Sequence, residues 1–496
     1  MQVEVRPIEK LRGARRIDLM ASLGPLIEAL SDETLDLSNL RVVCEWIQYR
    51  GNFRDPVDLR PIVGPAVQAF PAPGERVTDD GLEIALDLRR AGEVDLRAAL
   101  HDALRALLEG HHPGRIYLEA WVPESKSRIW RFNDLYWRAL SLWEEATGRE
   151  YEQALPGGES DARNRDATRA LILSLFDVWE GLEARNALPG ELYILELGVG
   201  NGNQAKTWLD EFVNLDRAHG HDYYRRLHYL MGDYSPHVLE RAQSAVSAHK
   251  EHVSALVLDA TQPTKTLGFL RYKTFLVYMS NVYDNLPSDE VASIRGRAYG
   301  VEVRAYLPAD TGGGIAKRLA VTPAKLPALV EKLLRLGPEV LHESLSVQFP
   351  TLDSAVEFWR ECWAEIKLEE RYVRLEGLDS YEIAPSLTGE TLRPLLESHG
   401  DVRMHVSNGA VSSFAGTLPL LHPFGQIQCH DLFVTDVGQY QTGFRGPGKY
   451  DGSVVNWVNG LLLERIGARR GFKVCFAPFR HREGSNVQTL TVNMRD

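Results

Sequence analysis

Three glycines at alternate positions, Gly198, Gly200 and Gly202, separate the apolar run YILEL (193–197) from an amphipathic stretch. Because glycine has no Cβ, such a turn can fold tightly at the end of a strand and let a ligand approach the backbone. The G-x-G-x-G spacing differs from the G-x-G-x-x-G of a dinucleotide turn, and the Gly-Lys-Ser/Thr of a P-loop does not follow. Glu196 places a carboxylate beside the turn, which favours a cationic ligand group over a pyrophosphate. The turn therefore predicts a ligand site; the alternative is a glycine loop that only closes tightly.

Two further acids follow the next two strand-like runs. Asp233 ends LHYLMGD (227–233), and Asp259 lies near the end of SALVLDA (254–260). In doubly wound sheets an acid at the second strand's tip accepts hydrogen bonds from two ribose hydroxyls, and an acid at the third could accept from an adenine amino group. Either acid alone could instead cap the next helix, but acids at three successive strand ends are hard to explain by capping alone. The predicted cofactor-binding residues are Glu196, Gly198, Gly200, Gly202, Asp233, Tyr234, Asp259 and Ala260.

The pattern around these residues predicts an α/β fold with a doubly wound, seven-stranded sheet, because short apolar runs alternate with helical patterns from residue 189 onward. The last two runs are joined by RHREGSN, which is too short for a crossover helix, so we expect an antiparallel terminal hairpin. A helix is predicted over 452–471, ending at Gly471. The seven predicted strands are LYILELG, LHYLMGD, SALVLDA, TFLVYMS, QIQCHDLFV, FKVCFAPF and VQTLTVNM.

The remaining segments suggest additional structural parts around this core. Residues 310–319, DTGGGIAKRL, are predicted to form a mobile loop, and the segment that contains them to cover the cleft as a lid. The predicted organisation is an N-terminal α/β accessory domain (1–128), a helical lead-in (129–188), a first core part that binds the cofactor (189–300), a helical insertion or lid subdomain (301–399) and a second core part (400–496).

Composition limits the class of protein. With 496 residues, 44% of them hydrophobic, the chain can bury a large core, and its net charge of −12 argues against a broad nucleic-acid footprint. The cysteines Cys44, Cys362, Cys429 and Cys475 form no CxxC pair and no metal-ligand spacing, as expected in a reducing compartment. No run approaches 18 uncharged apolar residues. We expect a soluble, cytoplasmic protein without a metal, a nucleic-acid partner or a membrane partner, whose oligomeric state the sequence does not indicate.

The segments ELGVGNG, GDYSP and LDAT resemble the first three motifs of class I S-adenosylmethionine-dependent methyltransferases. The expected seven-stranded sheet with a terminal hairpin resembles that family too. The resemblance implies S-adenosylmethionine as the cofactor and methyl transfer as the reaction. The interval between Glu196 and Asp233 exceeds the roughly 20 residues of a compact dinucleotide unit, which implies a longer crossover.

A narrower resemblance lies in SNVYDNLPSDEV (280–291), which is similar to the N-E-x-x-D-A-L-P segment of the MidA-like family, arginine methyltransferases linked to assembly of respiratory complex I. YLMGDYSPHVLERAQ is similar to that family's VE-x-SP segment, and GPGKYDGSVVNWVNG (446–460) stands where the family has G-x-x-D-I-T-x-x-V-D-F. The chain departs from the family at Val282, which replaces a glutamate, and at Ser453, which replaces a threonine. These departures affect the inferred substrate more than the inferred cofactor.

The residues after the fourth strand are the candidates for catalysis, because ligands of doubly wound sheets lie outside the carboxyl ends of the strands. We predict Asn281, Tyr283 and Asp284, with Asn281 accepting a hydrogen bond from the nucleophile and Asp284 taking up its proton. Capping of the next helix is the alternative for Asp284. His430 and Asp431 in the fifth strand are further candidates.

Some charged residues in the loop after the fifth strand are candidates for substrate contact, namely Arg445, Lys449 and Asp451, although solvated charges in a Gly/Pro turn are equally expected there.

Three functions remain open. The first is a methyltransferase acting on a nitrogen or oxygen nucleophile of a protein side chain or a small metabolite. The second is a nicotinamide-dependent oxidoreductase, which the glycine spacing and Glu196 disfavour. The third is a non-catalytic assembly or interaction protein that retains a methyltransferase scaffold, which Val282 makes plausible.

Overall fold

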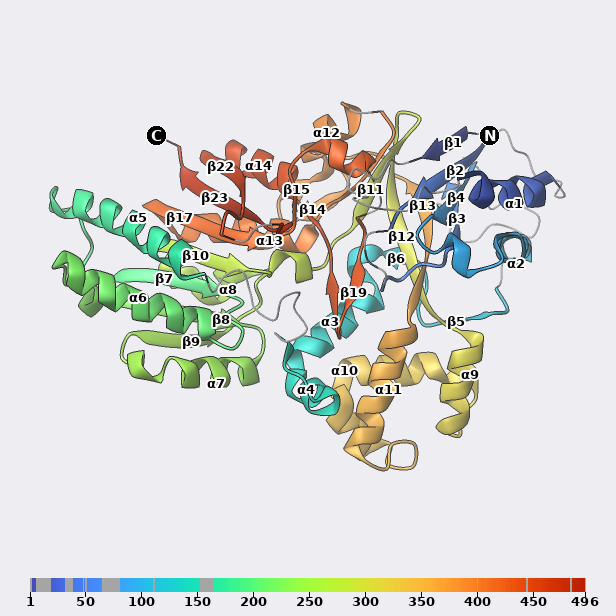
Figure 1. Cartoon of the computed structure of the whole chain (residues 1–496), viewed down its shortest axis with the longest axis horizontal. Coiled ribbons are helices and arrows are strands. Elements are labelled where there is room, and N and C mark those ends of the chain that lie inside the picture. Colours follow the sequence, from blue (N-terminus) through green and yellow to red (C-terminus); the bar gives the residue numbers. More distant parts are fainter. Residues whose placement is uncertain are drawn as a thin grey trace. The chain divides into compact units, whose positions relative to one another are not determined.

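The computed structural model divides the chain into two compact units. The described residues are 2–5, 19–31, 39–47, 49, 51–64, 81–109, 112–151, 164–398, 400–442, 445–481 and 484–495. The first unit comprises Met1–Asn133, Pro287–Val406 and Asp436–Trp457, and the second comprises Asp134–Leu286, Ser407–Thr435 and Val458–Asp496. Each unit is built on its own large sheet (Figure 1).

The second unit contains a seven-stranded sheet in the order β22-β23-β17-β10-β7-β8-β9. The five strands β17, β10, β7, β8 and β9 are parallel to one another. β23 is antiparallel to both β17 and β22. All seven predicted strands and the terminal hairpin are therefore confirmed. The strands are β7 (Leu192–Leu197), β8 (Leu227–Asp233), β9 (Val253–Val257), β10 (Thr274–Ser280), β17 (Leu421–Asp431), β22 (Phe472–Pro478) and β23 (Gln488–Met494).

The helices of this unit form two packed groups: α5 contacts α6 and α6 contacts α7, while α13 contacts α8 and α14. The first group covers the sheet face that carries Ile194 and Tyr229, where a core rich in aromatic side chains surrounds Trp179 and Trp208. The helices are α4 (Leu140–Thr147), α5 (Arg165–Glu183), α6 (Asn203–His219), α7 (Pro236–Ala245), α8 (Pro263–Leu267), α13 (Asn408–Thr417) and α14 (Gly460–Arg469).

Local sequence explains where the helices next to the glycine turn begin. Gly202 is the N-cap residue of α6, and α6 ends at His219, where the following Gly220 has the left-handed conformation usual after a helix. Ser235 caps α7 by accepting a hydrogen bond from the backbone N–H of Val238, and Pro236 occupies the first helical position. The N-termini of both helices therefore directly follow the carboxyl ends of β7 and β8.

The first unit contains a ten-stranded mixed sheet, with the path β1-β2-β4-β3-β13-β12-β11-β16 and with β5 and β6 paired to β12. These strands are β1 (Gln2–Val5), β2 (Leu40–Glu45), β3 (Val57–Val63), β4 (Gly81–Asp87), β5 (Arg115–Tyr117), β6 (Val122–Pro123), β11 (Glu290–Ile294), β12 (Arg297–Pro308), β13 (Lys367–Arg374) and β16 (Val402–His405).

This sheet joins segments that the sequence analysis treated separately. β3 lies in the N-terminal 128 residues and pairs in parallel with β13, which lies in the segment 301–399. The insertion therefore contributes strands as well as helices, and residues 287–300 also belong to the first unit. An unpaired strand edge exposes backbone hydrogen-bond donors and acceptors. In this sheet, strands from distant segments pair and so satisfy these groups.

The helices around this sheet are α1 (Leu19–Ser31), α2 (Leu96–Glu109), α9 (Ala309–Arg318), α10 (Leu326–Ser344), α11 (Leu352–Glu365) and α12 (Arg393–Glu397), and α3 spans Arg128–Arg138. Two expectations are wrong here. The segment 310–319, predicted as a mobile loop, lies almost entirely in α9. The helix predicted over 452–471 begins only at Gly460, because Asn459 caps it and residues 453–455 form β20 (Ser453–Val455).

One face of the ten-stranded sheet buries charged side chains. Arg60 is 1% exposed and donates to Glu83 at 2.8 Å, and its Nε lies 2.9 Å from Glu370. Arg403 donates to Glu370 with both terminal nitrogens, at 2.9 and 3.0 Å. Buried charges of this kind are tolerated because they are paired.

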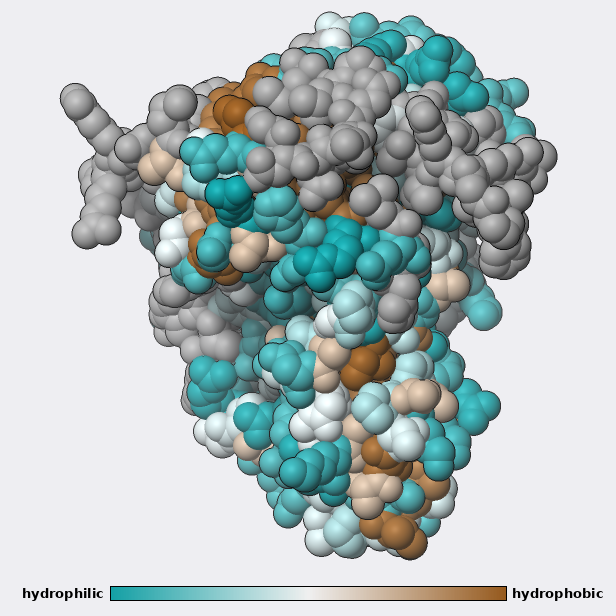
Figure 2. Space-filling model, turned by 90° about the vertical axis from the view of Figure 1, so that its right-hand side faces the viewer, coloured by the Kyte–Doolittle hydropathy of each residue, from teal (hydrophilic) through white to brown (hydrophobic). Residues whose placement is uncertain are grey.

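The surface shown in Figure 2 intersperses hydrophilic residues with small groups of hydrophobic ones. No helix in the part of the chain that the structure describes is both long enough and apolar enough to cross a lipid bilayer.

Candidate functional site

The glycine turn lies between β7 and α6, and each of its three glycines has a positive φ, +72°, +58° and +80° in chain order. A Cβ on Gly198 would lie 2.5 Å from Val282 Cγ2, and a Cβ on Gly202 would lie 2.6 Å from the Cα of Ala242. A Cβ on Gly200 would collide with the Tyr151 hydroxyl. All three positions therefore favour glycine through their positive φ, and at Gly202 the backbone of Ala242 also leaves no room for a Cβ.

Backbone hydrogen bonds hold this turn against β8. The N–H groups of Gly198 and Val199 donate to the carbonyl of Gly232, at 2.8 and 3.2 Å. Next to this contact, Asp233 accepts from the N–H of Gly200 at 3.3 Å and from that of Ser235 at 3.0 Å. The structure thus brings the glycine turn and Asp233 together.

Burial raises the pKa of Asp233 to about 6, although hydrogen bonds from backbone N–H groups partly offset that effect. A carboxylate at this position can still accept further hydrogen bonds, because each oxygen has two lone pairs.

Glu196 lies on the same face of the sheet as Ile194 and is 3% exposed. Its carboxyl accepts a hydrogen bond from the Tyr229 hydroxyl at 2.6 Å, and burial raises its pKa to about 8. At neutral pH Glu196 therefore carries a proton for most of the time. The sequence predicted a charged carboxylate beside the turn. In the structure, Glu196 is instead a buried acid that is hydrogen-bonded to Tyr229.

The ends of β8 and β9 lie side by side, because Asp233 pairs with Val257 in the parallel register. Tyr234 and Val257 are 42% and 55% exposed at this edge. Asp259 is exposed and accepts from both the N–H and the hydroxyl of Thr261, at 2.8 and 2.7 Å. These hydrogen bonds stay within the turn after β9, because the next helix α8 begins at Pro263 with Gln262 as its N-cap residue and receives no side-chain cap. Ala260 follows Asp259 in the same half-exposed turn.

Asn281 follows β10 directly and has a φ of +54°, which is uncommon for a residue with a Cβ. Its N–H donates to the carbonyl of His430 at 2.9 Å, and its side-chain oxygen accepts from the Ser280 hydroxyl at 3.1 Å. Left-handed residues of this kind cost roughly 1–3 kcal/mol and cluster at functional sites. The backbone of Asn281 is thus fixed by the neighbouring strand β17.

The next residues form a short 3₁₀ turn, η9 (Tyr283–Asn285), that is held by Asp431. Asp431 Oδ2 accepts from the N–H groups of Val282, Tyr283 and Asp284, at 3.1, 2.8 and 3.3 Å. Tyr283 and Asp284 are only 2% and 3% exposed. Asp431, which the sequence placed among the acceptor-facing candidates, therefore anchors this turn.

His430, the other candidate in β17, is buried. Its Nδ1 lies 2.9 Å from the Thr489 hydroxyl, and its ring packs edge-on against Phe479. These contacts correspond to a packed strand residue.

The candidates in the loop after the fifth strand belong to the first unit. Arg445 stacks over Trp457 with its guanidinium carbon 4.4 Å from the ring centre, and Lys449 donates to the carbonyl of Ala364 at 2.7 Å. The carbonyl of Asp451 accepts from the indole N–H of Trp363 at 2.6 Å. All three candidates are thus engaged in contacts within the first unit.

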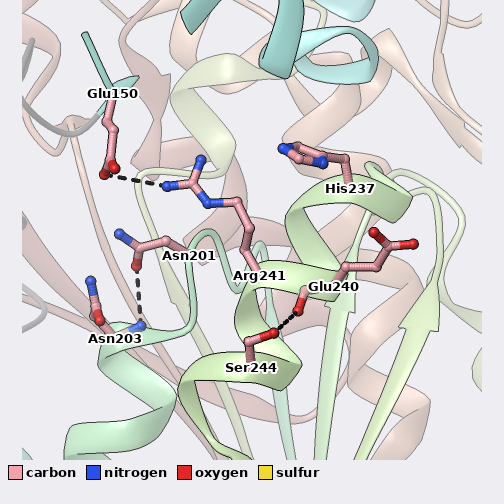
Figure 3. Close-up of a pocket in the computed structure, with 7 residues that line it drawn as sticks. All are labelled: Glu150, Asn201, Asn203, His237, Glu240, Arg241 and Ser244. Atoms are coloured by element: carbon pink, nitrogen blue, oxygen red, sulfur yellow. Dashed lines mark hydrogen bonds and ion pairs between the residues drawn. The ribbon is translucent and has the colours of Figure 1, made fainter. Parts of the chain in front are cut away.

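An open pocket of about 460 Å³ borders the outer side of the glycine turn (Figure 3). Arg241 projects into it from α7 and forms ion pairs with Glu144 at 2.7 Å and with Glu150 at 3.3 Å. The hydroxyl of Tyr151, the residue after Glu150, accepts from the N–H of Asn201 at 3.3 Å. The lining residues are Glu150, Asn201, Asn203, His237, Glu240, Arg241 and Ser244.

Sequence reasoning missed Tyr151 and Arg241. Arg241 lies inside the segment quoted for its acidic motif, and Tyr151 lies in the lead-in, 50 residues before the turn residue that it contacts. No local pattern marks either residue, because their contacts depend on how α4 and α7 pack.

Within the described residues, no group of three or more His, Cys, Asp or Glu side chains is arranged to hold a metal ion.

The chain matches no protein-family model, and no curated protein matches it in sequence. Among solved structures, it is similar to a protein from Burkholderia thailandensis bound to S-adenosyl-homocysteine, with 12% identity and a TM-score of 0.43 over 80% of this chain and 92% of that one. An uncharacterized protein from the same organism shows 14% identity and a TM-score of 0.40 over 80% and 91%. A methyltransferase from Streptomyces caelestis shows 10% identity and a TM-score of 0.30 over 70% and 95%.

Proposed function

We propose that this protein is an S-adenosylmethionine-dependent methyltransferase that binds its cofactor at the carboxyl ends of β7, β8 and β9. The observation that carries the proposal is the contact between the glycine turn and Asp233, in which the N–H of Gly200 donates to Asp233 Oδ2 at 3.3 Å. This contact places an acid that can accept from a ribose diol beside a backbone without Cβ atoms.

The topology of the sheet supports the same proposal. β7 is central, with β8 and β9 on one side and β10 and β17 on the other, and the antiparallel β23 lies between β17 and β22. The resemblance to class I methyltransferases led us to expect a seven-stranded sheet with an antiparallel terminal hairpin. The order reverses direction beside β7, and ligands of such sheets bind at that point.

The residues fit the cofactor in distinct ways. Gly198, Gly200 and Gly202 keep the backbone of the turn free of Cβ atoms, and in our proposal Asp233 binds the two ribose hydroxyls. Tyr234, Asp259 and Ala260 would border the adenine, and the exposed ring of Tyr234 offers it an apolar surface. Glu196 would act indirectly, because its hydrogen bond to Tyr229 ties β7 to β8 beneath the turn.

When bound, S-adenosylmethionine supplies a methyl group on a positively charged sulfur, which an aligned nucleophile displaces. The protein's task is then to orient the acceptor and to exclude water. We assign the acceptor side to Asn281, whose strained backbone is held between β10 and β17. The buried side chains of Tyr283 and Asp284 would shape the turn that presents Asn281. We propose a nitrogen or oxygen nucleophile of a protein side chain or small metabolite as the acceptor.

A non-catalytic assembly role on the same scaffold is the second candidate. It is favoured by Val282, which stands at the glutamate of the MidA-like pattern, and by the burial of Tyr283 and Asp284. Such a protein would still bind the cofactor, so cofactor binding and methyl transfer must be measured separately.

Calorimetric titration with S-adenosyl-homocysteine tests the proposal. We expect saturable binding to the wild type, weaker binding to Asp233→Ala and unchanged binding to Asp222→Ala, which removes a 73% exposed side chain. Wild-type protein that binds NADH but no S-adenosyl-homocysteine would overturn the proposal in favour of a nicotinamide enzyme. Binding without transfer of a labelled methyl group to any protein or metabolite fraction would favour the assembly role.

A further inference from the structure

Two acids lie at the carboxyl ends of the adjacent strands β10 and β17. Asp284 belongs to the turn after β10, and Asp431 is the last residue of β17. Their side chains are buried, at 3% and 0% exposed, and they hydrogen-bond to each other. A direct hydrogen bond between two carboxyl groups requires a proton on one of them.

The hydrogen bonds around the pair show which acid holds the proton. Asp431 accepts from four backbone N–H groups, those of residues 282, 283 and 284 at Oδ2 and that of Leu432 at Oδ1. Four donors stabilise the ionised form of Asp431. Asp284 receives two, the side-chain amide of Asn285 at 2.8 Å and its own backbone N–H. Asp284 is therefore the acid that donates and Asp431 the one that accepts.

The surroundings of the pair contain little that could neutralise two negative charges. Cys429 precedes Asp431 on β17, and Tyr283 lies in the turn next to Ser413 of α13. His430 is engaged with Thr489. Within the described residues, neither Asp284 nor Asp431 forms an ion pair with a Lys, Arg or His.

Burial acts on both acids in the same direction. It raises the pKa of Asp431 to about 6 and, together with the charge of Asp431, raises the pKa of Asp284 well above its ordinary value. Like charges this close cannot both ionise readily. The geometry and the electrostatics thus agree on a single retained proton.

We infer that Asp284 and Asp431 share one proton and that this pair is a positioning device, which fixes the turn after β10 as a wall of the cofactor site. The turn touches the glycine turn directly, because Val282 packs against Gly198, and it fixes the backbone that follows Asn281. An Asp284 that already carries a proton cannot act as the base that deprotonates an acceptor. The proton-sharing pair itself is independent of the proposed function; only its effect on cofactor binding rests on that function.

Infrared spectroscopy tests the pair without any assay of activity. The wild type at neutral pH should show one carboxylic-acid C=O band that is absent from Asp284→Asn, whereas the band of the protonated Glu196 should remain in both proteins. Asp259→Asn, which replaces an exposed acid at a neighbouring strand end, should leave both bands intact. Identical carboxylic-acid bands in the wild type and in folded Asp284→Asn would overturn the inference.

The pH dependence of S-adenosyl-homocysteine binding tests the positioning role. Removal of the shared proton at alkaline pH places two charges in a buried site, so wild-type affinity should fall as the pH rises. In Asp284→Asn the amide can still donate to Asp431 but has no proton that titrates, so the affinity of this variant should fall less between neutral and alkaline pH than that of the wild type. Equal loss of affinity in both proteins would overturn the positioning role.

Asp431→Asn provides the opposite change, since it replaces the acceptor that holds four N–H groups. If it folds, we expect weaker binding at all pH values; if it does not fold, the comparison of the wild type with Asp284→Asn still decides. Wild-type protein that shows the infrared band but binds no S-adenosyl-homocysteine would refute the proposed function and leave the proton-sharing pair standing.

Discussion

Val282 packs directly onto Gly198, with its Cγ2 2.5 Å from the position that a Cβ on the glycine would occupy. The turn after β10 therefore touches the turn after β7, although 84 positions separate the two residues in the chain. The glycine here is favoured by two independent effects, a positive φ and the contact with a neighbouring side chain.

These two effects can be separated by mutation. Gly198→Ala should lose roughly 1–2 kcal/mol for the left-handed backbone and roughly 1–3 kcal/mol for overpacking. In the double variant Gly198→Ala/Val282→Ala, mainly the stability lost to overpacking should be recovered. Gly220→Ala is the matched control, because its φ is +75° and no atom lies within 4 Å of its Cβ position, so it should lose only the first part. Equal free energies of unfolding for Gly198→Ala and Gly220→Ala, measured by urea denaturation, would contradict the packing argument.

Asp233→Ala removes the acid beside the glycine turn. If it binds the ribose diol, each charge-assisted hydrogen bond lost should weaken S-adenosyl-homocysteine binding by roughly 1.5–3 kcal/mol, which is about ten- to a hundredfold. Asp233→Asn should lose less, since its amide oxygen still accepts. Calorimetry on folded variants measures the difference, and unchanged affinity in Asp233→Ala would exclude this placement of the cofactor.

Glu196 should make the stability of the protein depend on pH. Its folded-state pKa is raised to about 8, so between its unfolded value near 4.5 and pH 8 the folded state binds more protons than the unfolded state. Stability from this group is therefore greatest below about pH 4.5 and falls as the pH rises towards 8.

Glu196→Gln removes this titration while keeping a side chain that accepts from Tyr229. The difference in Tm between Glu196→Gln and the wild type should thus grow in favour of the variant from pH 5 to pH 8. A Tm difference that stays constant across this range would show that Glu196 does not retain its proton.

The ion pairs of Arg241 should tether the segment that carries Tyr151. Arg241→Ala frees Glu144 and Glu150, so amide hydrogen exchange over residues 144–151 should accelerate. The change in global stability should be small, about 1 kcal/mol or less, because Arg241 is partly exposed. Arg225→Ala, which removes an exposed pair with Asp222, is the control and should leave exchange in 144–151 unchanged.

Much of the second unit could be predicted from the sequence because its signals are local. The seven strands appear as apolar runs, and RHREGSN is too short for anything but a hairpin. The glycine turn and Asp233 were also predictable as neighbours, since both follow strands that lie next to each other in a parallel sheet. In each case the side chains of one short segment carry the information.

The first unit was not predictable in this way. The pairing of β3 with β13 joins residues 62 and 63 to residues 372 and 373. No residue pattern in either segment identifies the strand with which it pairs. Strand pairing is formed by backbone groups that every residue possesses, so the choice of a distant partner depends on the whole chain. For this reason the sequence suggested a separate accessory domain and a separate insertion.

The sequence by itself determined the glycine turn, the strands that carry acids at their ends, and the hairpin that closes the sheet. Only the tertiary structure decided the state of those acids: Asp259 is exposed in a turn, Glu196 is buried against Tyr229, and Asp284 is buried against Asp431. A carboxyl group's charge depends on its solvation and on the donors around it, and both are set by side chains and backbone groups that arrive from other elements. The order of residues therefore specifies where an acid stands along the chain, whereas packing determines whether it binds a ligand, closes a turn or holds a proton.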